Sequence, residues 1–201
     1  MNHKIGSIGS GLNAFAVFTF ALSMLVESPF WSYLTSLVIA LTFILMASAF
    51  AHYGKENTRV AGLCALAFGS MYALCNLIVY FTQLSTVQNS PLSPEALSLL
   101  DFQQFGLMFH WDMLGYALMS FSTFFMGLTI NALTGTDRWL KGLLLVHGFF
   151  AVSCLITPMT SAFQPDNAST SDLGVYILMF WCVYFIPIGI LSMLHFGKKK
   201  D

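Results

Sequence analysis

Polar side chains recur along one face of an apolar stretch in the middle of the chain. Starting at Asp112, they follow at steps of four, four, three, four and four residues, which is the spacing of one helical face. Its members are Asp112, Tyr116, Ser120, Thr123, Gly127 and Asn131. A carboxylate on such a face can take up a proton or bind a cation, and hydroxyls and amides can hydrogen-bond a ligand. Two interpretations follow: the stripe lines a polar cavity, or it forms a hydrogen-bonded seam between packed helices.

Three further residues extend this candidate site. Asn76 continues a face of small residues on the preceding apolar stretch, a pattern that predicts close helix packing. His147 lies within the stretch that follows the stripe. His110 precedes Asp112 by two residues, so their side chains point to different faces of a helix. For Asp112 itself, an interfacial carboxylate that reaches water and a protonatable or cation-binding group are both open interpretations.

The composition assigns these residues to a membrane protein. The chain is 57% hydrophobic and only 8% charged, whereas a soluble domain carries about 25% charged residues. Continuous apolar runs exclude a barrel of alternating strands, so the prediction is an all-α bundle of six transmembrane helices in one domain, residues 1–201. Each span except the first has about the length that crosses ~30 Å of hydrocarbon, and the first is short unless it begins earlier, near Ile8. The expected spans are 12–26, 33–52, 60–82, 107–133, 139–159 and 173–196.

The basic residues give this bundle an orientation. All eight lie on one side of the six spans: Lys4, Lys55, Arg59, Arg138, Lys141, Lys198, Lys199 and Lys200. By the positive-inside rule, both ends of the chain are expected in the cytoplasm. On the opposite side, Ser93 and Pro94 form a helix-start signal, which predicts a short helix at about 94–103 on the outer membrane surface.

Several classes of function lack support in the sequence. A net charge of −1 argues against nucleic acid as a partner. The chain contains no Walker loop, GxSxG, HExxH or dinucleotide-binding glycine pattern, so no ATPase, hydrolase or zinc protease of known type is predicted. A b-type haem would need histidines at matched depth on adjacent helices, but His52 and His195 lie nearer the membrane edge than His147. The cofactor and metal content stay open.

The layout resembles the small six-span membrane proteins of bacteria and archaea that are grouped in domain-of-unknown-function families. The resemblance covers the topology and the segment Asp137 to Leu144, a basic-aromatic turn that opens the fifth span. It implies the fold and a multi-pass protein of a bacterial or archaeal cell membrane. Those families supply no activity to carry over.

Three functional hypotheses remain. The leading one is a protein that binds or transports a small solute or lipid-like ligand through a polar cavity lined by the third to fifth spans. The alternative is a structural or regulatory membrane subunit that packs against a partner, either another membrane protein or a second copy. The third is a haem or redox enzyme that uses the histidines. The lipid bilayer is the partner common to all three.

Overall fold

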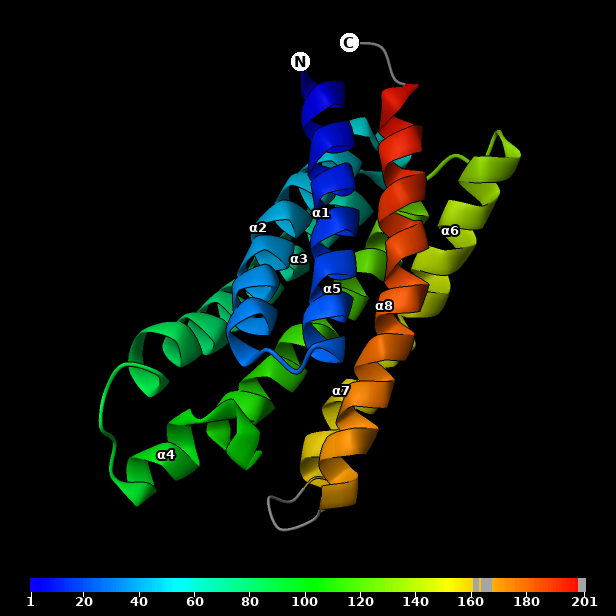
Figure 1. The fold of residues 1–201 in the computed structure, drawn as a ribbon. Helices are drawn as coiled ribbons and strands as arrows, with labels where there is room; N and C mark the ends of the chain where they lie inside the picture. Colours follow the sequence, from blue (N-terminus) through cyan, green and yellow to red (C-terminus); the bar gives the residue numbers. More distant parts are fainter. Residues whose placement is uncertain (161–162, 164–167, 199–201) are drawn as a thin grey trace.

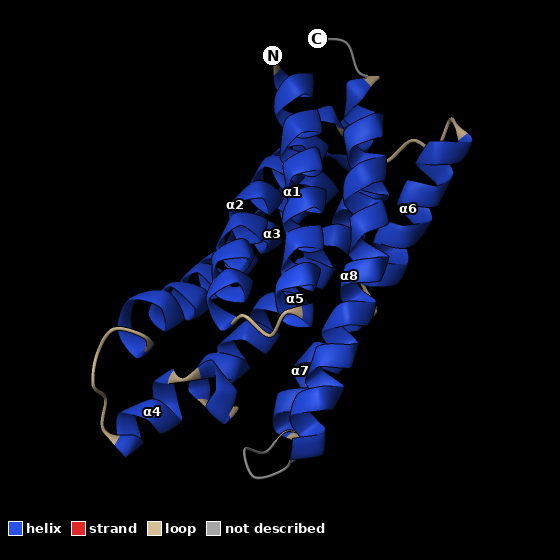
Figure 2. Ribbon diagram, in the orientation of Figure 1, coloured by secondary structure: helices blue, strands red, loops and turns tan. Residues whose placement is uncertain are grey.

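The computed structural model describes residues 1–160, 163 and 168–198, and these residues form a helical bundle without strands (Figures 1 and 2). The prediction of an all-α fold is therefore confirmed. Lys199 and Lys200 lie outside the described residues. The helices are α1 (Asn2–Leu25), α2 (Pro29–Tyr53), α3 (Arg59–Thr82), α4 (Pro94–Leu100), α5 (Leu107–Thr129), α6 (Gly135–His147), α7 (Phe150–Ile156) and α8 (Ala168–Gly197).

Five segments of the described chain are long and apolar enough to cross a membrane. They are α1, α2, Glu56–Val87 around α3, Gly135–Met159 with α6 and α7, and Leu173–Gly197 in α8. Helix α5, the expected fourth span, is not among them. It carries Asp112 and several hydroxyl side chains.

The helices pack side by side in a curved arrangement, in which the first helix, α1, is a neighbour of the last helix, α8. Helix α1 lies between α2 and α8, α2 packs on α3, and α3 packs on α5 along most of its length. Helices α6 and α7 cover another side of α5, and α6 returns to α8. The start of α1 and the end of α8 therefore lie side by side at the same end of the bundle (Figure 1).

Small residues allow α3 and α5 to approach closely. A Cβ atom on Gly69 of α3 would lie 3.0 Å from Ser122 Oγ of α5. Ser122 Oγ in turn donates a hydrogen bond of 2.6 Å to the backbone carbonyl of Ala65. In a bilayer, where burying apolar surface drives helix association weakly, such close packing and interhelical hydrogen bonds hold helices together.

The expected fifth span is broken in two. Helix α6 ends at His147 and α7 begins at Phe150. Across the break, the amides of Gly148 and Ala151 bond to carbonyls three residues earlier, each at 3.2 Å, which is 3₁₀-type bonding. Tyr184 of α8 donates a 2.7 Å hydrogen bond to the carbonyl of Leu143 and so ties this segment to α8.

A buried glutamine anchors the segment between α3 and α5. Gln83 lies in a π-helical turn that continues α3 and is fully buried. Its Nε2 donates to the carbonyl of Leu100 at 2.8 Å, and its Oε1 accepts from the amide of Phe102 at 3.0 Å. These bonds hold the end of α4 against the bundle. Ser93 caps the start of α4, because its side chain accepts a hydrogen bond from the amide of Ala96.

Candidate functional site

The structure divides the polar stripe of α5 into separate groups. Asp112, Ser120 and Thr123 are buried, and Tyr116 is partly buried. Asn131 lies beyond the end of α5, where its side chain is exposed. His110 is exposed as well, on a different face of α5 from Asp112.

The first group, which we call the Asp112 site, joins α3 to α5. Asp112 is 2% exposed and Asn76 is 1% exposed. Tyr80 Oη donates a hydrogen bond of 3.0 Å to Asp112 Oδ2. Gly115 lets the amide of Asn76 come close to α5, because a Cβ atom at Gly115 would lie only 2.5 Å from Asn76 Oδ1.

Two acceptor oxygens of this site are unsatisfied. Neither Asp112 Oδ1 nor Asn76 Oδ1 has a hydrogen-bond partner among the described residues. Buried polar atoms are almost always paired, so two unpaired acceptors on adjacent helices call for a donor or a positive charge. In the described chain no Lys or Arg neutralises the carboxylate, since the basic residues lie at the opposite end of the bundle.

Tyrosine side chains surround the Asp112 site. The ring of Tyr116 lies 6.3 Å from that of Tyr72, centroid to centroid, and its hydroxyl neighbours that of Tyr80. Tyr72 is 1% exposed and Tyr80 is 3% exposed. These hydroxyls lie in an otherwise apolar environment. Like water, they can both donate and accept hydrogen bonds.

The second group centres on His147, which is 1% exposed. Trp181 Nε1 donates to His147 Nε2 at 3.1 Å, and His147 Nδ1 lies 2.8 Å from Thr123 Oγ1. An indole N–H only donates, so we assign the ring proton to Nδ1, which then donates to Thr123. Thr123 Oγ1 in turn donates a hydrogen bond of 2.9 Å to the backbone carbonyl of Ser120.

This network connects α5, α6 and α8, and it occupies both ring nitrogens of His147. The ring also stacks on Phe150, with centroids 5.2 Å apart. An iron ligand at His147 would have to displace one of these hydrogen bonds. The other two histidines considered for haem are also engaged at the far end of the bundle: His195 with Asp137 at 2.7 Å, and His52 with Asn2 at 3.0 Å.

His147→Phe is expected to destabilise the protein by about 2 kcal/mol, because it leaves the buried Trp181 N–H without an acceptor. Trp181→Phe should relieve part of that cost. The coupling between the two substitutions should be about 1 kcal/mol, within the range found for hydrogen bonds between membrane helices. Reversible unfolding of the single and double variants measures it. His110→Phe, at an exposed histidine, is the control. If the losses of unfolding free energy of the two single variants simply add in the double variant, the hydrogen bond between Trp181 and His147 is contradicted.

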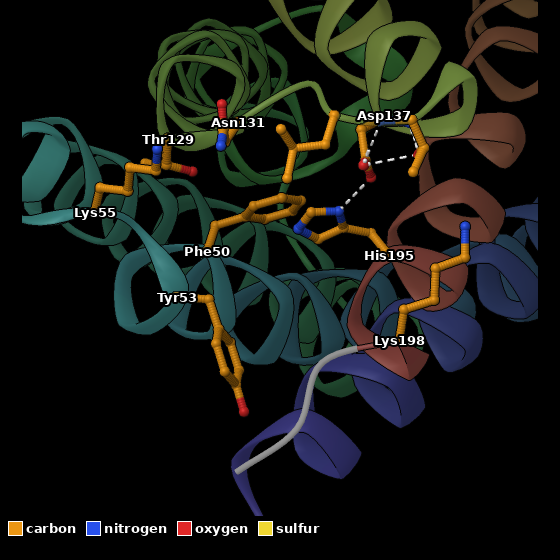
Figure 3. Close-up of a pocket in the computed structure, with 10 residues that line it drawn as sticks. Phe50, Tyr53, Lys55, Thr129, Asn131, Asp137, His195 and Lys198 are labelled. Carbon is orange, nitrogen blue, oxygen red and sulfur yellow. Dashed lines mark hydrogen bonds and ion pairs between the residues drawn. The ribbon is translucent and has the colours of Figure 1, made fainter.

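A third group forms a pocket of about 270 Å³ at the end where α1 begins and α8 ends, which we call the inner-end pocket (Figure 3). Its acid is already paired: Asp137 Oδ1 lies 2.7 Å from His195 Nδ1, and Oδ2 accepts from the amide and hydroxyl of Thr134 at 3.2 and 2.8 Å. Thr134 and Asp137 form the capping box of α6. The lining residues are Phe50, Tyr53, Lys55, Thr129, Asn131, Leu133, Thr134, Asp137, His195 and Lys198.

No protein-family model, curated protein or solved structure matches this chain.

Of the predicted site residues, Asn131 lines the inner-end pocket instead of the Asp112 site. The other members of this pocket did not emerge from the sequence as a site. The available signal was the gathering of every basic residue, with His52 and His195, at one end of the spans.

A second pocket, of about 460 Å³, is apolar and lies where α3 and α5 meet the α6–α7 break. It is lined by Phe68, Phe121, Phe124, Phe125, Gly148 and Phe149.

Proposed function

We propose that this protein is a membrane protein that binds a small monovalent cation, a proton or an alkali ion, at the Asp112 site as a step in transport. The observation that carries the proposal is the pair of buried acceptor oxygens without donors, Asp112 Oδ1 and Asn76 Oδ1. Leaving each unpaired costs about 1–3 kcal/mol. One bound cation offers both oxygens a positive partner.

The chemistry of the site favours a small, singly charged ligand. The site holds one carboxylate and neutral oxygens, so a monovalent cation balances its charge. Asp112 is only 2% exposed, which leaves little room beside its carboxylate for a bulky organic solute. Tyr80 holds Oδ2 of the carboxylate in place, which leaves Oδ1 directed to the ligand.

The stability of the purified protein in detergent tests this proposal directly. A cation that binds the folded state stabilises it by mass action, by about 2.7 kcal/mol at a hundred times its dissociation constant. Replacing choline by sodium or lithium at equal ionic strength should therefore raise the unfolding temperature if an alkali ion binds. If a proton binds, the folded protein holds more protons than the unfolded chain, so the unfolding free energy should fall as pH rises. A response to neither would contradict the proposal.

We also propose six spans, with α5 as the fourth and both ends of the chain in the cytoplasm. Helix α5 has 23 residues, and at about 1.5 Å per residue it is long enough for ~30 Å of hydrocarbon. An odd number of spans would separate the two ends, yet the start of α1 and the end of α8 lie at the same end of the bundle. The one-sided basic residues support the cytoplasmic assignment.

Cysteine labelling distinguishes this topology from its reverse. In a variant that lacks the four native cysteines, a membrane-impermeant maleimide should label Ser90→Cys in intact cells. It should label Asn57→Cys only after the membrane is opened. Both positions are exposed, so access depends on the side of the membrane. Labelling of Asn57→Cys from outside intact cells would show that the orientation is the reverse of the proposed one.

A second candidate function, a subunit that packs against a partner, is favoured by the phenylalanine-lined pocket at the α6–α7 break. Phe149 on its rim is 72% exposed. An apolar helix of a partner or of a second copy could fill this pocket. If the stability proves insensitive to cations and to pH, this subunit function becomes the better explanation of the chain.

A further inference from the structure

We propose that the inner-end pocket binds the phosphate group of an anionic ligand, either a phospholipid headgroup or a soluble phosphate ester. This proposal is independent of the Asp112 site, because the two sites share no residue and lie toward opposite ends of the bundle. It rests on the charge, the donors and the size of the pocket.

Two ammonium groups give the pocket its charge. Lys55 comes from the link between α2 and α3, and Lys198 follows the end of α8. In Figure 3 they lie on opposite sides of the pocket, with Phe50 and His195 between them. Two cations brought from distant parts of the chain to one concave surface favour a ligand with more than one anionic oxygen.

The acid in the pocket does not cancel this charge. Both oxygens of Asp137 are engaged, Oδ1 with His195 and Oδ2 with the amide and hydroxyl of Thr134. Two ammonium groups against one carboxylate leave the pocket with a net positive charge toward a ligand.

The remaining lining suits a headgroup-sized ligand. The amide of Asn131 is exposed on the wall and can donate to a phosphate oxygen. Phe50 is 2% exposed and stacks on His195, with ring centroids 6.1 Å apart, which gives a rigid apolar floor. A volume of about 270 Å³ lies just below the usual range for whole organic ligands, about 300–1,000 Å³, and fits a single polar group.

The test compares two charge-matched double variants of the full-length protein. Lys55→Gln with Lys198→Gln removes the ammonium groups of the pocket. Lys4→Gln with Arg138→Gln removes the same charge from exposed positions at the same end, outside the lining. All four side chains are exposed, so both variants should fold.

Each protein is reconstituted in nanodiscs of phosphatidylcholine alone or of an equal mixture with phosphatidylglycerol, and retained phosphatidylglycerol is measured by native mass spectrometry. A parallel arm in detergent follows stabilisation by glycerol phosphate or inorganic phosphate against chloride at equal ionic strength. We expect the pocket variant to bind about ten- to thirtyfold more weakly and the control variant to bind like the wild type. Binding of phosphatidylglycerol alone identifies a headgroup, and binding of the soluble probes identifies a phosphate ester. Equal losses in both variants, or a loss in neither, would overturn the proposal.

Discussion

Asp112→Asn is expected to abolish the response of the protein to alkali cations, and the part of its pH response that Asp112 contributes, while leaving it folded. Asparagine has the shape of aspartate and keeps an acceptor for Tyr80, which now donates to Asp112 Oδ2 at 3.0 Å. Its amide nitrogen takes the place of the unpaired oxygen Asp112 Oδ1, so this position no longer needs a cation. The unfolding temperature of the variant in choline should therefore equal or exceed that of the wild type. Sodium or lithium should no longer alter it, and the part of the pH response that Asp112 contributes should be lost.

Asp101→Asn is the matched control for this prediction. Asp101 is also a carboxylate and lies shortly before α5, but it is only partly buried and caps the turn that follows α4 by accepting from the amide of Gln103 at 3.0 Å. This variant should keep the cation and pH responses of the wild type. If Asp112→Asn also keeps them, the carboxylate is part of a packed seam and the cation site is lost as an explanation.

Tyr80→Phe gives a complementary result at the same site. It leaves both oxygens of the Asp112 carboxylate without a donor in a buried position. The variant should be less stable than the wild type in choline, by about 1–3 kcal/mol. Addition of the cation should recover more stability than it does in the wild type, because the ligand then compensates for two unpaired oxygens.

The helical spacing of the polar residues applies only as far as α5 extends, and Asn131 lies beyond its end. Helical spacing continues to Asn131, but the backbone leaves the helix at Ile130, with φ −78° and ψ 123°. The reason lies a few residues later, where Thr134 and Asp137 form the capping box that begins α6. Spacing alone does not reveal a helix end, whereas the Thr134–Asp137 pattern in the sequence does.

The partners of that face were less predictable. Asn76 was the residue of α3 that the sequence assigned to the candidate site. Among the described residues, Tyr80 makes the hydrogen bond to Asp112, and the carbonyl oxygen of Asn76 is unpaired. The spacing of residues shows which side chains share a face, but the rotation of one helix against another decides which of them meet. The inner-end pocket combines residues from Phe50 to Lys198, so it requires the complete packing of the bundle.

Contact between the first and last helices is a further feature that the sequence did not indicate, and Gly189→Leu tests it. A Cβ atom on Gly189 would lie 2.8 Å from the Cβ of Ala14 and 3.1 Å from its Cα and N. Backbone atoms cannot rotate aside, so a larger side chain must push α8 away from α1. We expect a loss of about 2–3 kcal/mol or more in unfolding free energy, at the upper end of the usual cost of overpacking.

Gly142→Leu is the matched control, because Gly142 is also helical and a Cβ atom there meets nothing within 4 Å. Both substitutions gain about 1 kcal/mol of helix propensity, so the difference between the two variants isolates the contact with α1. Unfolding in sodium dodecyl sulfate, followed by tryptophan fluorescence, measures both. Ala14→Gly should partly rescue Gly189→Leu, since it removes the nearest atom and leaves the backbone of α1 in place. Equal stability of the two leucine variants would mean that α1 and α8 do not pack at this distance. The two termini would then no longer be known to lie at the same end of the bundle, and this argument for an even number of spans would be lost.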